Sequence, residues 1–178
     1  MTSSAQEGHS LQQMRGPVRL SDVELETADW PLSLVANYSE HRLALVRVAA
    51  LILGSRSLAE EAVQDAVVTV RSRWDSLEHP GAYLRMAVVN RAKDMVRGRR
   101  FEWPVDDLGT ELPDSVVDLH RYLGLLPSRQ RVAVVLRFFV DLDDTEIAAQ
   151  LGCRPGTVRS LISRAMTTLR NEMNNESP

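Results

Sequence analysis

Four arginines lie close together near the C-terminal end of the chain, in a stretch without acidic residues. Residues 154–170 contain no Asp or Glu, although the whole chain carries a net charge of −3. Solubility requires only a net charge of either sign, so a local cationic strip on an acidic chain favours contact with phosphate groups. The polar residues of this stretch that are predicted to face outward and contact DNA are Arg154, Thr157, Arg159, Ser160, Ser163 and Arg164.

A second basic block is followed at once by an acidic stretch. Residues 85–100 hold six cations, with Asp94 as their one acid, and residues 101–118 hold six acids and no base. This order predicts a nucleic-acid-binding helix that ends in a tether of opposite charge. The alternative is that the cations complement the negative C-terminal end of a helix, although six cations exceed what a helix dipole requires. The cations are Arg85, Arg91, Lys93, Arg97, Arg99 and Arg100.

Residue patterns typical of catalysis, metal binding or membrane insertion do not occur in the sequence. His9, His41, His79 and His120 are far apart and have no acidic or cysteine companions at ligand spacing, so no metal site is predicted. Glycine motifs for nucleotides and nucleophile elbows are also missing, so neither a cofactor nor an enzymatic activity is predicted. Without a bilayer-length apolar run or a signal pattern, the chain is predicted to be cytoplasmic, with no membrane insertion.

Two helices joined at a glycine are predicted to carry the C-terminal arginines. Asp143 and Glu146 have capping-box spacing and begin the first helix, which Gly152 ends. Pro155 is suited to the first turn of the second helix. This is the pattern of a helix-turn-helix whose second helix reads DNA, and the alternative is an ordinary helical hairpin with a polar outer face. The apolar residues at helical spacing on the second helix are Val158, Leu161, Ile162, Ala165 and Leu169.

The first half of the chain is predicted to form three helices. A long helix with an apolar face begins at about Leu34 and ends at Gly54. The second helix opens with a capping box made by Ser57 and Glu60. The third begins at Pro80 and carries the basic block.

The predicted fold is all-α, with two small helical domains joined by an acidic linker and a helix-turn-helix in the second domain. The linker contains two prolines and one glycine and has no period. The second domain is expected to open with a short helix to Leu125, followed by a helix capped by Ser128. The predicted divisions are a disordered N-terminal extension at 1–29, a first domain at 30–100, the linker at 101–115 and a second domain at 116–173.

Two stretches of the sequence resemble the extracytoplasmic-function (ECF) group of bacterial RNA polymerase sigma factors, in the sigma-70 family. LAEEAVQDAVVTVRSRWDSLEHPGAYLRMAVVNRAKDMVRGRR resembles their N-terminal domain, and LPSRQRVAVVLRFFVDLDDTEIAAQLGCRPGTVRSLISRAMTTLR resembles their promoter-reading C-terminal domain. The stretches occur in the family's order. The resemblance implies a non-catalytic subunit that binds core RNA polymerase and promoter DNA and directs transcription initiation. The alternatives are a stand-alone helix-turn-helix regulator and a helical scaffold that binds no DNA.

The resemblance also implies roles for individual residues. It implies that the exposed side of the second helix binds the β′ clamp helices of the polymerase, through Glu60, Glu61, Gln64 and Asp65. The third helix would melt the −10 promoter element, through Tyr83, Asn90, Arg91, Lys93, Asp94 and Arg97. The loop 75–81 would offer a pocket for a flipped base. The second helix of the helix-turn-helix would read the −35 element, through Arg154, Thr157, Arg159, Ser160, Ser163 and Arg164.

Further partners follow from the same resemblance, and some alternatives stay open. The C-terminal domain is expected at the β flap, the acidic linker in the active-site channel, and an anti-sigma factor as regulator. The alternatives to these roles are that the acidic side of the second helix is only solvated, that the linker is a plain spacer, and that Asn90 and Asp94 brace the fold. Val67, Val68 and Val70 replace residues that are often aromatic in the family, and Tyr83 replaces a tryptophan. Arg154 and Pro155 stand in place of the usual serine cap and acid. These departures bring the inherited contacts into question.

Overall fold

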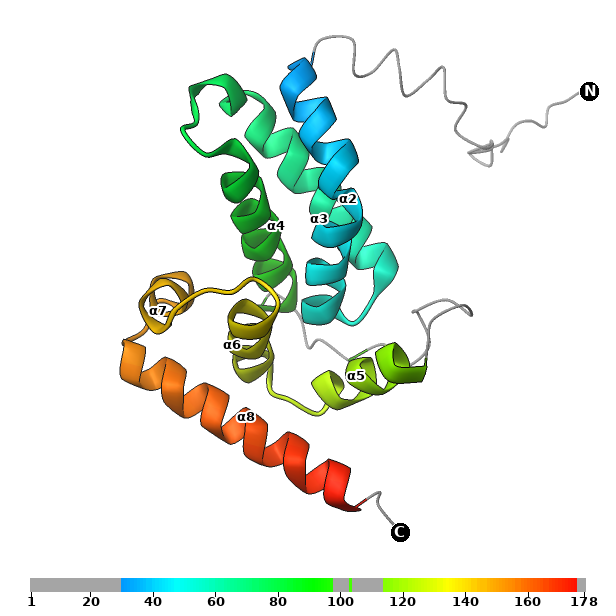
Figure 1. The fold of residues 1–178 in the computed structure, drawn as a ribbon, viewed down its shortest axis with the longest axis vertical. Coiled ribbons are helices and arrows are strands. Elements are labelled where there is room, and N and C mark those ends of the chain that lie inside the picture. The colour runs from blue at the N-terminus through cyan, green and yellow to red at the C-terminus, as the bar shows by residue number, and fades with distance from the viewer. Residues whose placement is uncertain (1–29, 98–102, 104–113, 176–178) are drawn as a thin grey trace, which may run out of the picture. The chain divides into compact units, whose positions relative to one another are not determined.

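The N-terminal half of the described chain is a bundle of three helices. The structure, a computed structural model, describes residues 30–97, 103 and 114–175. The three helices pack on one another, and a short 3-10 turn, η1, connects the second to the third (Figure 1). Their bounds are α2 at Leu32–Leu53, α3 at Arg56–Arg71, η1 at Trp74–Ser76 and α4 at Pro80–Arg97.

The core of this bundle comes from apolar residues at helical spacing. On α3 the buried face is made largely of alanine and valine, which lets the neighbouring helices approach closely. Trp74 closes one end of the bundle, and its indole N–H donates to the Ser33 hydroxyl at 3.0 Å. Among the most deeply buried side chains are Leu34, Ile52, Leu53, Val63, Leu84 and Val88.

The ends of the first two helices follow local signals, with one correction. Gly54 ends α2 in the left-handed region at φ 69°, as predicted, and glycine adopts this conformation without a steric penalty. The capping box predicted at Ser57 and Glu60 is wrong. The cap of α3 is Ser55, whose hydroxyl accepts a hydrogen bond from the backbone N–H of Leu58 at 3.2 Å. The helix therefore begins before the predicted position.

The C-terminal half contains the predicted helix-turn-helix. The capping box at Asp143 and Glu146 is confirmed, because each side chain accepts from the backbone N–H of the other. Gly152 ends the first helix at φ 59°, and the second helix begins at Pro155. The predicted cap at Ser128 is wrong, because the N-cap is Pro127 and no side chain bonds there. The helices are α5 at Asp114–Gly124, α6 at Ser128–Phe138, α7 at Asp144–Leu151 and α8 at Pro155–Asn175.

The described helices, from α2 to α8, all belong to the unit Pro31–Pro178. Within this unit, α6, α7 and α8 pack on one another, and α2 also contacts α6 (Figure 1). All regular elements of the described residues are helices, so the all-α prediction is confirmed. The predicted domain limits stay predictions. The extension 1–29 and most of the linker lie outside the described residues.

Candidate nucleic-acid interface

Five of the six residues predicted to read the −35 element lie on α8, and the sixth, Arg154, directly precedes its first residue. The inner face of α8 packs against α6 and α7, where Val158 and Ala165 are fully buried. The first acid along α8 is Glu172, so the part of the helix that follows the turn carries only positive charge. Four of the six residues also line an open hollow in the surface. The exposed residues are Arg154, Thr157, Arg159, Ser160, Ser163 and Arg164, and the hollow is lined by Arg159, Ser160, Ser163 and Arg164.

Arg159 has an acidic neighbour that the sequence did not reveal. Asp144, in the first turn of α7, places one carboxylate oxygen 3.6 Å from the Arg159 Nε, and its other oxygen pairs with Arg137 of α6. The Arg159 side chain is 71% exposed, so this ion pair is weak and screened by solvent. The guanidinium therefore has a preferred position at the surface of the helix-turn-helix and stays accessible.

The residues predicted to contact the −10 element all lie on α4, but their surroundings differ. Tyr83, Asn90, Asp94 and Arg97 are exposed. The Arg91 Nε donates to an Asp65 carboxylate oxygen of α3 at 2.7 Å. Four of the six residues are thus open to solvent, whereas Arg91 and Lys93 are half-buried.

Lys93 is bound from two sides. Its ammonium donates to the Asn90 side-chain oxygen at 2.9 Å and to the backbone carbonyl of Gln150, near the end of α7. Burial lowers the pKa of Lys93, Asp94 opposes that shift, and Arg97 adds to it. Asn90 thus accepts a hydrogen bond within α4, and the alternative that Asn90 and Asp94 brace the fold stays a prediction.

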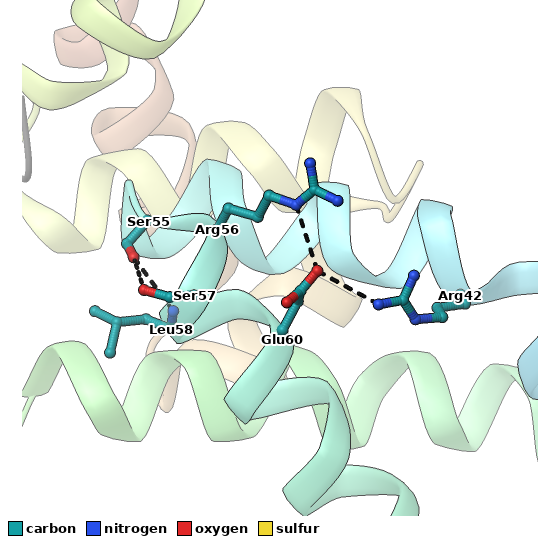
Figure 2. A network of polar contacts seen from close by, with 6 residues as sticks. All are labelled: Arg42, Ser55, Arg56, Ser57, Leu58 and Glu60. Carbon is teal, nitrogen blue, oxygen red and sulfur yellow. Dashed lines mark hydrogen bonds and ion pairs between the residues drawn. The ribbon is translucent and has the colours of Figure 1, made fainter. Parts of the chain in front are cut away.

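The residues predicted to bind polymerase lie on one side of α3. Glu61 and Gln64 are exposed, and Glu60 and Asp65 are half-buried. One Glu60 carboxylate oxygen lies between the guanidinium of Arg42 on α2, at 3.4 Å, and that of Arg56, at 3.3 Å (Figure 2). Exposed ion pairs of this kind contribute at most about 1 kcal/mol, so a partner can rearrange them.

Asp65 and Glu61 are linked to the predicted −10 surface through Arg91. Arg91 is 2.7 Å from Asp65 and 4.0 Å from Glu61. The two predicted binding surfaces therefore share a border along α3 and α4. In the loop 75–81, Asp75, Glu78 and His79 are exposed, and the base pocket expected there stays a prediction.

A buried cluster of aromatic and cationic side chains was not predicted from the sequence. Arg131 of α6 is 3% exposed, and its guanidinium donates to the backbone carbonyls of Ile52, at 3.0 Å, Leu126, at 3.2 Å, and Leu123, at 3.3 Å. The guanidinium carbon also lies 4.1 Å from the centre of the Trp103 ring. Burial lowers the pKa of Arg131 to about 10, so it is still a cation at neutral pH.

His120 completes this cluster. It is 6% exposed, its Nε2 donates to the carbonyl of Gly54 at 2.7 Å, and its ring centre lies 4.6 Å from that of Trp103. The sequence analysis considered His120 only in excluding a metal site and predicted no role for it. No signal in the sequence joins a linker tryptophan to the end of a helix about fifty residues earlier.

The part of the chain that the structure describes contains no group of three or more potential metal ligands. None of its helices combines the length and the apolar character that a bilayer crossing requires.

Two family models match the chain. The model described as Sigma-70 region 2 matches residues 38–102, and the one described as Sigma-70, region 4 matches residues 117–169. The RNA polymerase sigma-E factor of Streptomyces avermitilis is 34% identical over 145 residues, which cover 73% of this chain and 79% of that protein. RNA polymerase sigma factor SigV of Bacillus subtilis is 27% identical over 153 residues, covering 80% and 92%.

Solved structures give the same fold. CnrH in complex with the cytosolic domain of CnrY matches with a TM-score of 0.60 and 23% identity, over 86% of this chain and 95% of that chain. The sigma factor RpoE in complex with the anti-sigma factor NepR, from Bartonella quintana, matches with a TM-score of 0.60 and 24% identity, over 88% and 99%.

Proposed function

Because the chain belongs to the ECF group of the sigma-70 family of RNA polymerase sigma factors, we propose that α8 reads the −35 element of its promoters and α4 the −10 element. As a sigma factor it binds core RNA polymerase and promoter DNA and directs transcription initiation, with no catalysis of its own. The assignment of residues to these contacts is the proposal.

The observation that carries the proposal is the outer face of α8, where exposed arginines and hydroxyl groups share one side of a helix that follows a glycine turn. Arginine can bond a guanine edge with two hydrogen bonds in the major groove, and hydroxyl groups can bond bases or phosphates. Arg159 and Arg164 are separated by little more than one helical turn and line the same hollow, so we assign base contacts to them first.

On α4, the exposed side chains suit separated strands better than duplex DNA. Tyr83 offers an aromatic face on which an unpaired base can stack, and Arg97 offers a charge for the backbone. Arg91 and Lys93 are held by protein contacts in the free chain, so their DNA contacts require those partners to be exchanged. This assigns the first contacts to Tyr83 and Arg97.

Polymerase binding is assigned to the side of α3 that carries Glu60, Glu61, Gln64 and Asp65, with the β′ clamp helices as its partner. The C-terminal half is assigned to the β flap. Two structural neighbours were solved in complexes, CnrH with the cytosolic domain of CnrY and RpoE with the anti-sigma factor NepR, which supports an anti-sigma factor as a further partner of this chain. The place of action of such an assembly is the cytoplasm.

The test uses purified core polymerase and a promoter library randomised at the −35 and −10 elements. Arg159→Ala and Arg164→Ala should each relax the preference at a base of the −35 element by about 1–3 kcal/mol, which is about 5-fold to 150-fold. Arg170→Ala is the matched control, because Arg170 is an exposed arginine of the same helix outside the six assigned residues. An unchanged base preference in both variants would remove α8 as the reading helix.

A further inference from the structure

The carboxylate of Asp144 contacts two arginines on two different helices. Asp144 lies in the first turn of α7, directly after the N-cap residue Asp143. One of its oxygens accepts a hydrogen bond from Nη2 of Arg137 on α6, and the other lies 3.6 Å from Nε of Arg159 on α8. Asp144 therefore connects the three helices that pack on one another in the C-terminal half.

The two ion pairs of Asp144 differ in how firmly they are held. Asp144 and Arg137 are both half-buried, whereas Arg159 is exposed. The positive end of a helix also favours a carboxylate in the first turn. Asp144 is thus fixed by α6 and α7, and Arg159 is the member of the group that is free to change its conformation.

The contact engages one end of the Arg159 guanidinium. A guanidinium carries five N–H donors in a planar fork, one on Nε and four on the two terminal nitrogens. Asp144 lies beside Nε, so the two terminal nitrogens are left for another partner. Such a pair of nitrogens matches O6 and N7 of a guanine in the major groove. An arginine without this restraint has more rotamer freedom to lose before it can make the same contact.

The carboxylate also opposes contacts between Arg159 and the DNA backbone. Phosphate groups are negatively charged, so a carboxylate beside the guanidinium repels them and offsets part of their attraction. A guanine edge carries no net charge, so its contact with Arg159 is weakened less. Specificity is a difference between affinities, and it increases when the competing contact is weakened more than the correct one.

We infer that Asp144 is a positioning residue, which holds Arg159 for contact with a guanine of the −35 element and raises the sequence specificity of α8. This inference rests on the proposed function, because it requires that Arg159 reads a base. Asp144 acts through Arg159 and makes no base contact itself. The alternative is that Asp144 only joins α7 to α6 through Arg137, and its loss would then leave the base preference unchanged.

The test measures base preference at the −35 element with the full chain bound to core polymerase, on the randomised promoter library. The position read by Arg159 is the one at which Arg159→Ala relaxes the preference. Asp144→Asn keeps the shape of the side chain and an oxygen that can accept from Arg137. It should reduce the preference for guanine at that position by about 2-fold to 5-fold, the range expected for an exposed ion pair. Asp144→Glu restores the charge and should recover part of the preference.

A charge-matched variant and a double variant complete the experiment. Asp118→Asn also removes one exposed carboxylate from the C-terminal half, but Asp118 lies on α5 and is paired with Arg121 at 3.7 Å. It should leave the base preference unchanged. Asp144→Asn combined with Arg159→Ala should show the same preference as Arg159→Ala alone, because the effect of Asp144 requires Arg159.

The outcomes separate the inference from the function on which it rests. An unchanged preference in Asp144→Asn, or a further loss in the double variant, would overturn the positioning role and leave α8 as the reading helix. A position of Arg159 at which another base is preferred would overturn the assignment to guanine. If neither Arg159→Ala nor Arg164→Ala changes the preference at any −35 base, the proposed function of α8 fails, whatever Asp144→Asn shows.

Discussion

Arg131→Met should be among the most destabilising single substitutions in the described chain outside the apolar core. Methionine keeps most of the length and apolar character of the arginine stem but has no donor. The substitution therefore removes the hydrogen bonds to the carbonyls of Ile52, Leu123 and Leu126 and leaves the packing against Trp103. The change in unfolding free energy therefore reports the hydrogen bonds of Arg131 and not its packing.

The magnitude depends on how many buried carbonyls lose their hydrogen-bond donor. The Leu123 carbonyl also accepts from the backbone N–H of Leu126, so it keeps one bond. The carbonyls of Ile52 and Leu126 accept from Arg131, and a buried carbonyl left without a donor costs about 1–3 kcal/mol. Two such groups give a loss of about 3 kcal/mol, which lowers the melting temperature by about 6–12 °C for a chain of this size.

The assay is urea unfolding followed by circular dichroism, with the full chain at neutral pH, where Arg131 is charged in both states. Arg129→Met is the matched control, because Arg129 is an exposed arginine of the same helix that makes one bond to the carbonyl of Leu151 at 3.2 Å. It should lose less than about 1 kcal/mol. A loss in Arg131→Met no larger than in Arg129→Met would refute the reasoning, because the carbonyls would then find water or another donor.

Three further predictions concern other sites. Asp143→Ala removes the cap of α7 and should lower the unfolding free energy by about 1 kcal/mol in urea titrations, whereas Asp118→Ala, at an exposed residue with a 3.7 Å ion pair, should change it less. Asp144→Asn removes the carboxylate beside Arg159, so affinity for non-specific duplex DNA should rise by about twofold to fivefold in filter binding, and a fall would contradict the pairing. Burial lowers the pKa of folded Lys93 below 10.5, so the unfolded state binds more protons in that alkaline window. The wild type should therefore gain stability relative to Lys93→Met as the pH rises towards 10.5, and an opposite slope in urea titrations would show that Lys93 gains a charge partner on folding.

Local chemistry was sufficient to predict the helix ends that depend on one residue. Gly54 and Gly152 have positive φ values, which only a few residue types adopt readily, and Pro155 favours a first turn. The start of α3 was mispredicted because Ser55 and Ser57 offer the same hydroxyl and both precede a helical pattern. The path of the chain after Gly54 decides between them, and that path is a property of the whole bundle.

For the candidate site, helical periodicity predicted which side chains of a helix are exposed and nothing beyond that. The buried positions Val158 and Ala165 determine which side of α8 faces outward, so its exposed residues could be predicted. The pairings between residues on different helices could not be predicted. Asp65 with Arg91, and Lys93 with the Gln150 carbonyl, join residues far apart in the chain, and many acids and carbonyls were equally available in the sequence.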